Sequence, residues 1–277
     1  MTVRYAAPAD LPAIRTIWLA SFPGDTPQAV EHFLAHVFGG ENCMLAVVDG
    51  QPVSMTFILP AFYHDGGNKR RLQYIYAAAT LPEYRGRGIF GALLRQTLRL
   101  GENAGLDGSY LRPATPKLVE YYAKFGYTRY FGVIEEWYTA QAVSASAVQA
   151  IAAKDYAAER ERLLAAHCPV PYVLLSEEAA VYAAGSGTAV SDGIHAALTE
   201  PLMPLERDTV TVRELCGPAA GRETFLDGVC RHTGAKKLKV FRYAEPGETA
   251  VFNGMLYPFK DWPPAANPLP YMGLTLE

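Results

Sequence analysis

Residues 82–91 read PEYRGRGIFG and stand between a stretch typical of a strand and a stretch typical of a helix. Three glycines, Gly86, Gly88 and Gly91, let backbone N–H groups approach a bound group closely. The first turn of a helix has N–H groups without intrahelical acceptors and lies at the positive end of the helix dipole, which favours a phosphate. Arg85 and Arg87 add positive charge. We therefore expect an anion-binding turn here, in preference to a purely structural loop.

The turn lies in a basic segment of a mildly acidic chain. The 277 residues contain 25 Lys and Arg against 28 Asp and Glu, a formal net charge of −3. Between Lys69 and Arg99, by contrast, seven basic residues stand against one acid, Glu83. Proteins that coat nucleic acid usually carry a cationic excess over the whole chain, so we expect no nucleic-acid partner. The local charge indicates a site for a small polyanion, although a solvated helix face beside an arginine-rich turn is an equal alternative on charge alone.

The composition predicts a globular chain of two domains. Half of the residues are hydrophobic, and 277 residues exceed the usual length of one domain. The four cysteines form no Cys-x-x-Cys pair, which favours reduced thiols and a cytoplasmic location. The sequence has neither a leader pattern nor a long apolar run, so we expect neither secretion nor a membrane span. His32 and His36 have the spacing of a helical metal-ligand pair, but no third ligand accompanies them, so we expect no metal.

The first 140 residues predict a mixed α/β domain. Apolar positions at helical spacing predict helices at residues 11–21, 27–38, 87–104 and 116–124. Runs typical of strands lie at residues 3–6, 44–48, 52–63, 72–81, 109–112 and 127–138. Asp49 and Gly50 form a strong two-residue hairpin signal between two of these strands.

Residues 141–277 predict a second domain, whose first part, residues 140–153, is a helical or loose connector rich in Ala and Ser. Helices are expected at residues 155–167 and 221–233, and strands at 172–175, 181–184, 209–215, 238–243 and 271–276. The strand, turn, helix and strand at 209–243 repeat the order found at 72–112. The second domain is therefore compatible with a diverged copy of the first.

The glycine turn also satisfies a different pattern. Gly86, Gly88 and Gly91 have the G-x-G-x-x-G spacing of dinucleotide-binding folds, and Asp107 follows about 20 residues later. Four residues, however, separate the strand from the first glycine, Asp107 precedes the next strand, and two helices and a hairpin come first. A nicotinamide or flavin oxidoreductase is therefore the minor alternative.

Two motifs carry a resemblance to a known family. Residues 85–90, RGRGIF, resemble the Arg/Gln-x-x-Gly-x-Gly/Ala signature of the GNAT N-acetyltransferase superfamily, and the strand order of residues 1–140 is similar to that family's. Phe90 departs from the small residue of the signature at a position that contributes mainly a backbone N–H. Residues 120–127, EYYAKFGY, resemble the family's Tyr-x-x-x-Gly-Phe/Tyr helix ending.

The resemblance implies a fold and a division of the chain. The fold is the GNAT acyl-CoA N-acyltransferase fold, an α/β (α+β) arrangement with a central mixed, largely antiparallel sheet flanked by helices. Residues 1–140 would be the acetyltransferase domain, and residues 141–277 a degenerate GNAT-like domain with a C-terminal tail. Tandem acetyltransferases of the enhanced-intracellular-survival type resemble this plan. The second half has no Arg-x-x-Gly-x-Gly loop, so we expect it to have lost acyl-CoA binding.

The resemblance also implies roles for residues. The bound anion would be the pyrophosphate of acetyl-CoA, the co-substrate. The strand end would hold the pantetheine arm and the turn the phosphates, through Ala78, Ala79, Thr80, Arg85, Gly86, Arg87, Gly88, Ile89, Phe90 and Gly91. Tyr122 would be the catalytic acid that protonates the departing thiolate. Tyr121, about 100° further around the helix, is expected in the core.

The expected function is transfer of an acetyl group to a primary amine of a small molecule or peptide by direct attack. The alternative is a non-catalytic acyl-CoA-binding or regulatory protein, because the strand at residues 72–81 contains no carboxylate to act as a base. The base stays open among Glu135, Glu136, Asp25, a water chain and the terminal carboxylate after Glu277. The acceptor and the oligomeric state, a homo-oligomer included, also stay open.

Overall fold

The computed structural model describes residues 1–39, 41–141, 145–201 and 208–276. Two compact units share the chain. Unit 1 comprises residues 1–62, 70–128 and 255–262, and unit 2 comprises residues 63–69, 129–254 and 263–277. Unit 1 therefore contains a segment that follows most of unit 2 in the sequence, and unit 2 contains the tip of a hairpin from the first part of the chain.

Unit 1 is built on a mixed, largely antiparallel sheet. Its strands are β1 (Thr2–Tyr5), β2 (Cys43–Val48), β3 (Gln51–Asp65), β4 (Asn68–Thr80), β5 (Gly108–Leu111) and β13 (Val251–Pro258), in the order β1-β2-β3-β4-β5-β13. β2 pairs antiparallel with β1 and β3, and β13 pairs antiparallel with β5. β4 and β5 run parallel, with a helix between them in the sequence.

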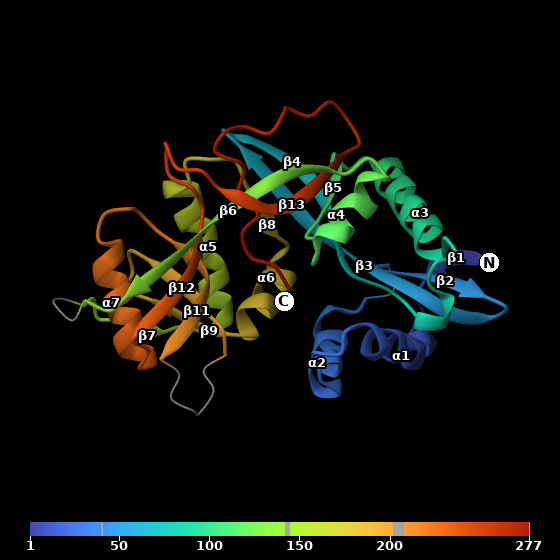
Figure 1. The fold of residues 1–277 in the computed structure, drawn as a ribbon, viewed down its shortest axis with the longest axis horizontal. Coiled ribbons are helices and arrows are strands. Elements are labelled where there is room, and N and C mark those ends of the chain that lie inside the picture. The colour runs from blue at the N-terminus through green and yellow to red at the C-terminus, as the bar shows by residue number, and fades with distance from the viewer. Residues whose placement is uncertain (40, 142–144, 202–207, 277) are drawn as a thin grey trace. The chain divides into compact units, whose positions relative to one another are not determined.

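Four helices flank this sheet, and all four were predicted from the sequence. They are α1 (Leu11–Ser21), α2 (Pro27–Val37), α3 (Ile89–Asn103) and α4 (Pro116–Ala123). In Figure 1, α1 and α2 lie on one side of the strands of unit 1 and α3 on the other. The hydroxyls of Thr26 and Thr115 accept backbone hydrogen bonds at the starts of α2 and α4, where a proline follows each cap.

Unit 2 contains a second run of hydrogen-bonded strands. Its strands include β6 (Thr128–Thr139), β7 (Gln149–Ala150), β9 (Thr188–Ser191), β10 (Ala196–Thr199), β11 (Thr209–Cys216) and β12 (Lys237–Arg242), in the order β6-β12-β11-β10-β9-β7. A further short strand is β8 (Tyr172–Leu175), and the helices are α5 (Ala153–His167), α6 (Glu177–Gly185) and α7 (Arg222–Thr233). β11 and β12 run parallel and α7 connects them.

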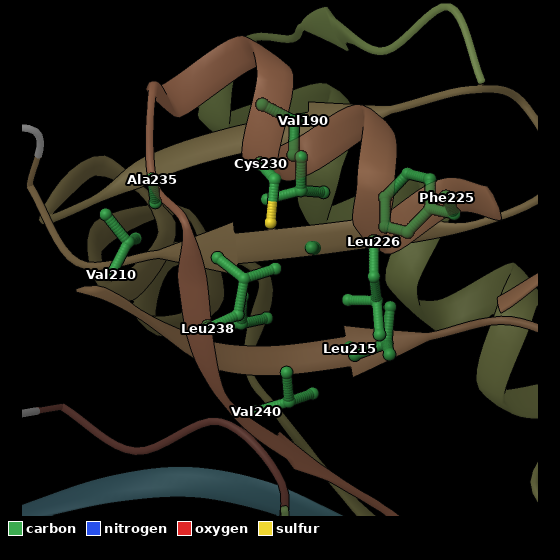
Figure 2. Packing of buried hydrophobic residues seen from close by; sticks show 12 residues of the cluster. Val190, Val210, Leu215, Phe225, Leu226, Cys230, Ala235, Leu238 and Val240 are labelled. Carbon is green, nitrogen blue, oxygen red and sulfur yellow. The ribbon is translucent and has the colours of Figure 1, made fainter. Parts of the chain in front are cut away.

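The core between α7 and the sheet of unit 2 is apolar throughout. Figure 2 shows side chains of α7 pointing toward those of β11 and β12. The buried cluster consists of Val190, Ala197, Val210, Val212, Leu215, Phe225, Leu226, Val229, Cys230, Ala235, Leu238 and Val240. The strand-helix-strand unit expected at residues 209–243 is therefore present.

Two strand predictions in the second half are wrong. Residues 181–184 belong to the helix α6, because Ser176 caps it at Ala179 and its interior is rich in alanine, the strongest helix former. Residues 271–276 form only isolated bridges at Tyr271, since Gly273 has φ +70° and the N–H of Leu274 donates to a Glu214 side chain. The strands β7, β9, β10 and β13 were not predicted.

None of the helices in the described ranges has the length and apolar character needed to cross a membrane.

Candidate functional site

The strands β4 and β5 of unit 1 are paired over only part of their length. Their parallel register covers only three pairs, from Leu72 with Gly108 to Tyr74 with Tyr110. β4 then continues through residues 75–80 without a further pair to β5. Ala77 has φ +47°, the left-handed region in which a residue with a side chain is uncommon, so the strand is irregular there. An unpaired edge of this kind presents backbone N–H and C=O groups to an extended ligand.

The end of β4 is held by side chains of the protein itself. The buried Ser54 donates its hydroxyl to the carbonyl oxygen of Ala79 at 2.7 Å. The Thr80 hydroxyl lies 2.8 Å from that of Ser54 and donates to it, since the single Ser54 proton is already used. Arg85 Nε donates to the carbonyl oxygen of Thr80 at 2.9 Å. The carbonyls of Ala79 and Thr80 therefore already accept hydrogen bonds from side chains of the protein.

The glycine turn follows directly and opens α3. Gly86 and Gly88 have φ +74° and +75°, and a Cβ at either position would meet no heavy atom within 4 Å. Glycine is needed here for the backbone conformation, and the space in front of it is open. The first helical hydrogen bond runs from Ala92 N to Gly88 O, at 3.1 Å. The N–H groups of Ile89 and Phe90 precede it, so they have no intrahelical acceptor and face an approaching anion.

Gly91 has a different role in the structure. A Cβ there would lie 3.0 Å from Cζ of Phe125, the residue that follows α4 by two positions. Glycine at this position lets the end of α4 pack closely against the first turn of α3.

The two arginines of the turn are placed differently. The Arg85 guanidinium binds the Thr80 carbonyl and also donates from Nη2 to the Ser21 hydroxyl at 3.3 Å. Arg87 is exposed, and its guanidinium carbon lies 5.2 Å from the centre of the Tyr84 ring. No hydrogen bond of the Arg87 guanidinium is found among the described residues, so its charge remains available to an anion.

Another arginine of the basic segment binds the C-terminal end of α3. Arg71 Nη2 donates to the carbonyl oxygens of Ala104 and Gly105, at 3.3 and 3.0 Å. Cations at a helix C-terminus stabilise the dipole, so this arginine is structural. Asp107, the acid of the dinucleotide alternative, accepts hydrogen bonds from the Arg71 N–H at 2.7 Å and from Lys260 Nζ at 2.8 Å. Its carboxylate is therefore already engaged.

Tyr122, from the motif at residues 120–127, contacts Phe90 of the motif at residues 85–90. Its side chain is 6% exposed, and its ring lies 6.4 Å from that of Phe90 and 5.9 Å from that of Tyr127, both in edge contact. Burial, with a smaller effect of the neighbouring Tyr121, raises the pKa of the Tyr122 phenol well above its usual value. In the described parts of the chain its hydroxyl makes no hydrogen bond, so the proton is free to be donated.

The expectation for Tyr121 is wrong in part. Tyr121 is half-buried, whereas Tyr122 is the deeper residue of the pair. The reason is that Tyr122 faces Tyr127, which is fully buried and bonded to the Ser109 hydroxyl at 2.7 Å. Tyr121 instead packs on Phe125 and Phe90, with ring centres 5.1 and 6.3 Å away. The contacts of Phe90 with both tyrosines had no signal in the sequence.

The carboxylates named as candidate bases are spread over the molecule. Glu135 pairs with Lys239 and Glu136 with Arg242, each at 2.8 Å within unit 2. Asp25 lies in unit 1 and accepts a hydrogen bond from Trp18 Nε1 at 2.6 Å. The terminal carboxylate lies outside the described residues.

The aromatic rings around Trp18 include that of Tyr76 in β4, 5.9 Å away. In the same unit His32 and His36 stack with ring centres 4.2 Å apart. Groups of three or more metal-ligating side chains are absent from the part of the chain that the structure describes.

The corresponding turn of unit 2 is closed. A Cβ on Gly217 would lie 2.7 Å from the His195 ring, and one on Gly221 would lie 3.3 Å from it. His195 is buried, stacks on Phe225 and bonds the carbonyl of Pro218 at 3.0 Å. β11 also pairs with β12 as far as Leu215 with Arg242, with an irregularity between Val212 and Leu215. In the described residues of unit 2, the paired strands thus reach the turn, and the turn itself is filled.

Sequence comparison assigns the first part of the chain to a family. Residues 2–130 match the family described as "Acetyltransferase (GNAT) domain". Curated proteins, by contrast, give no match to this chain.

Solved structures match nearly the whole chain. A GCN5-related N-acetyltransferase from Kribbella flavida is 19% identical, with a TM-score of 0.72 over 93% of this chain and 72% of that chain. One from Anabaena variabilis is 16% identical, with a TM-score of 0.74 over 94% and 73%. Eis1 from Mycobacterium abscessus is 14% identical, with a TM-score of 0.68 over 94% and 74%. These likenesses confirm the fold class expected from the sequence.

Proposed function

We propose that this protein, whose residues 2–130 are a GNAT acetyltransferase domain, transfers the acetyl group of acetyl-CoA to a primary amine of a small molecule or peptide. One observation carries the proposal. β4 leaves β5 after Tyr74 and runs, along an unpaired edge, into a turn with open space at Gly86 and Gly88. An extended thioester with a pyrophosphate at one end matches this sequence of strand edge and helix N-terminus.

Residues of the turn and strand divide the binding of the donor between them. The free N–H groups at the start of α3 are suited to the pyrophosphate, with the Arg87 charge beside them. The edge at residues 78–80 would hold the pantetheine arm through backbone groups other than the carbonyls of Ala79 and Thr80, which are already bonded within the protein. Bound acetyl-CoA supplies an acetyl group already activated as a thioester.

Tyr122 is the group we assign to the departing sulfur. Its raised pKa keeps the phenol protonated at neutral pH, so it offers an O–H where negative charge develops. A coenzyme thiol is a stronger acid than this phenol, so the hydrogen bond itself stabilises the thiolate. The attacking amine, with an ordinary pKa near about 10, must first lose a proton. Since residues 72–81 have no carboxylate, that proton leaves to water or to a group outside the strand.

The test has two stages. Acetyl-CoA is first added in a thermal unfolding experiment, and release of free thiol is then followed against a library of primary amines. Stabilisation together with thiol release and an acetylated product supports the enzyme. An absence of any stabilisation would contradict every role that involves acetyl-CoA.

The second candidate is a non-catalytic acyl-CoA-binding or regulatory protein. The lack of a carboxylate in the donor-binding strand is the observation that favours it. Stabilisation by acetyl-CoA without thiol release for any amine of the library would support this candidate and contradict the first.

A further inference from the structure

We propose that Arg85 is a positioning residue, which ties the end of α1 to the end of β4, rather than a ligand of the donor phosphates. The proposal rests on the function proposed above. It assigns separate roles to the two arginines of the glycine turn, although only one glycine separates them in the sequence.

Three groups meet at this point of unit 1. Arg85 Nε donates to the carbonyl oxygen of Thr80 at 2.9 Å, and Arg85 Nη2 donates to the Ser21 hydroxyl at 3.3 Å. The Ser21 hydroxyl itself donates toward the same Thr80 carbonyl at 3.4 Å. Because the guanidinium is a rigid planar fork, it fixes the two acceptors relative to each other.

The two acceptors each stand at the end of an element. Thr80 is the last residue of β4, and Ser21 is the last residue of α1. The turn after Ser21 carries Asp25, whose N–H bonds the carbonyl of Phe22 at 3.1 Å and whose carboxylate bonds Trp18. Fixing Ser21 against Thr80 therefore fixes this turn relative to the strand that would hold the thioester.

Arg87 provides the matched comparison within the same turn. It is exposed, its guanidinium lies over the Tyr84 ring, and it makes no guanidinium hydrogen bond in the described residues. A phosphate would find the Arg87 guanidinium free of hydrogen bonds, whereas two of the five N–H donors of Arg85, one on Nε and one on Nη2, are used within unit 1.

The experiment uses two donors that differ in their phosphates. Acetyl-CoA carries the pyrophosphate and S-acetylpantetheine does not. For Arg85→Ala we expect kcat to fall about 10- to 100-fold with both donors, because both lose the alignment of strand and turn. The ratio of kcat/KM for acetyl-CoA over S-acetylpantetheine should then stay within about twofold of the wild type. For Arg87→Ala this ratio should fall about tenfold.

Two further readouts do not depend on turnover. Binding of 3′,5′-ADP, measured by calorimetry, should weaken about tenfold in Arg87→Ala and change less than about twofold in Arg85→Ala. Hydrogen exchange of the backbone N–H groups of Phe22 and Asp25 should accelerate in Arg85→Ala and remain slow in Arg87→Ala. Ser21→Ala removes one arm of the link without touching the turn, and it should accelerate the same two amides.

The results separate this inference from the proposed function. The positioning role would be overturned if Arg85→Ala lowered the ratio of kcat/KM values and the affinity for 3′,5′-ADP as much as Arg87→Ala does, while its hydrogen exchange stayed unchanged. Wild-type activity in Arg85→Ala with unchanged exchange would overturn it as well. Failure of the wild type to use either donor would instead count against the acetyltransferase, and the binding and exchange measurements would still decide the role of Arg85.

Discussion

The rings of Tyr74 and Tyr110 stack with centres 4.7 Å apart, in the last pair of residues that joins β4 to β5. Both side chains are buried. The stack therefore closes the paired part of the sheet at the point where the unpaired edge of β4 begins, and the geometry of the proposed donor site depends on it.

Replacing Tyr110 should destabilise the protein strongly. Tyr110→Ala removes a fully buried ring beside the opening, so the free energy of unfolding should fall by about 3–5 kcal/mol. Urea unfolding followed by circular dichroism measures it. Tyr5→Ala is the control, because Tyr5 is 40% exposed, and it should change stability by no more than about 0.5 kcal/mol. A Tyr110→Ala variant as stable as this control would contradict the packing described here.

Gly88 should be needed for binding as well as for the backbone. Gly88→Ala forces a side chain to φ +75°, which should cost about 1–2 kcal/mol, and places a methyl group in the open space at the start of α3. Gly50→Ala is a matched control, since Gly50 has φ +81° and equally open surroundings in the turn between β2 and β3. Both variants should lose similar stability, but only Gly88→Ala should weaken acetyl-CoA binding in calorimetry. Equal binding by both variants would place the donor elsewhere.

Acetyl-CoA should bind once per chain. In unit 2 the His195 ring fills the turn at Gly217 and Gly221, and β11 pairs with β12 again at its end, Leu215 with Arg242. Calorimetric titration should therefore give one site, which is lost in Gly88→Ala. A second site that survives that substitution would show that the turn of unit 2 opens.

The acid stability should depend on Glu248. Hydrogen bonds from Arg242, at 2.6 and 2.7 Å, lower the pKa of the Glu248 carboxyl to about 2. Its stabilising contribution is present above the unfolded pKa of about 4.3 and is lost as the pH falls toward about 2. Urea midpoints measured from neutral pH downward should thus fall less steeply between about pH 5 and 2 in Glu248→Gln than in the wild type.

Glu102→Gln serves as the control for that titration. Glu102 is exposed on α3 and has no ion pair in the described residues, so this variant should keep the acid slope of the wild type. Identical slopes for all three proteins would show that the Arg242 pair adds nothing to acid stability.

Much of unit 1 could be predicted because its signals are local. Thr26 and Thr115 cap two helices whose ranges were expected from the sequence, and Gly86 and Gly88 in the turn have positive φ angles. The GNAT fold was expected from a motif of six residues, RGRGIF, and a strand order, and the comparisons confirm it.

The parts that could not be predicted depend on distant contacts. The hydrogen bond from Arg85 to the Ser21 hydroxyl, 64 residues earlier in the sequence, had no local signal. β13 adds to the edge of β5 from the far end of the chain, and no residue in it signals that pairing. Tyr121 and Tyr122 could not be ranked by burial, because the depth of Tyr122 follows from its contact with Tyr127.

The most direct test of the account is the rate of Tyr122→Phe. This variant keeps the ring and its contacts with Phe90 and Tyr127 but has no O–H to donate. With saturating acetyl-CoA and an accepted amine, kcat for thiol release should fall about 10²- to 10⁴-fold, while calorimetry shows unchanged binding of acetyl-CoA. Tyr121→Phe should retain the wild-type rate. Full activity of Tyr122→Phe across the pH range would contradict the central claim that transfer takes place beside Tyr122, at the opening between β4 and β5.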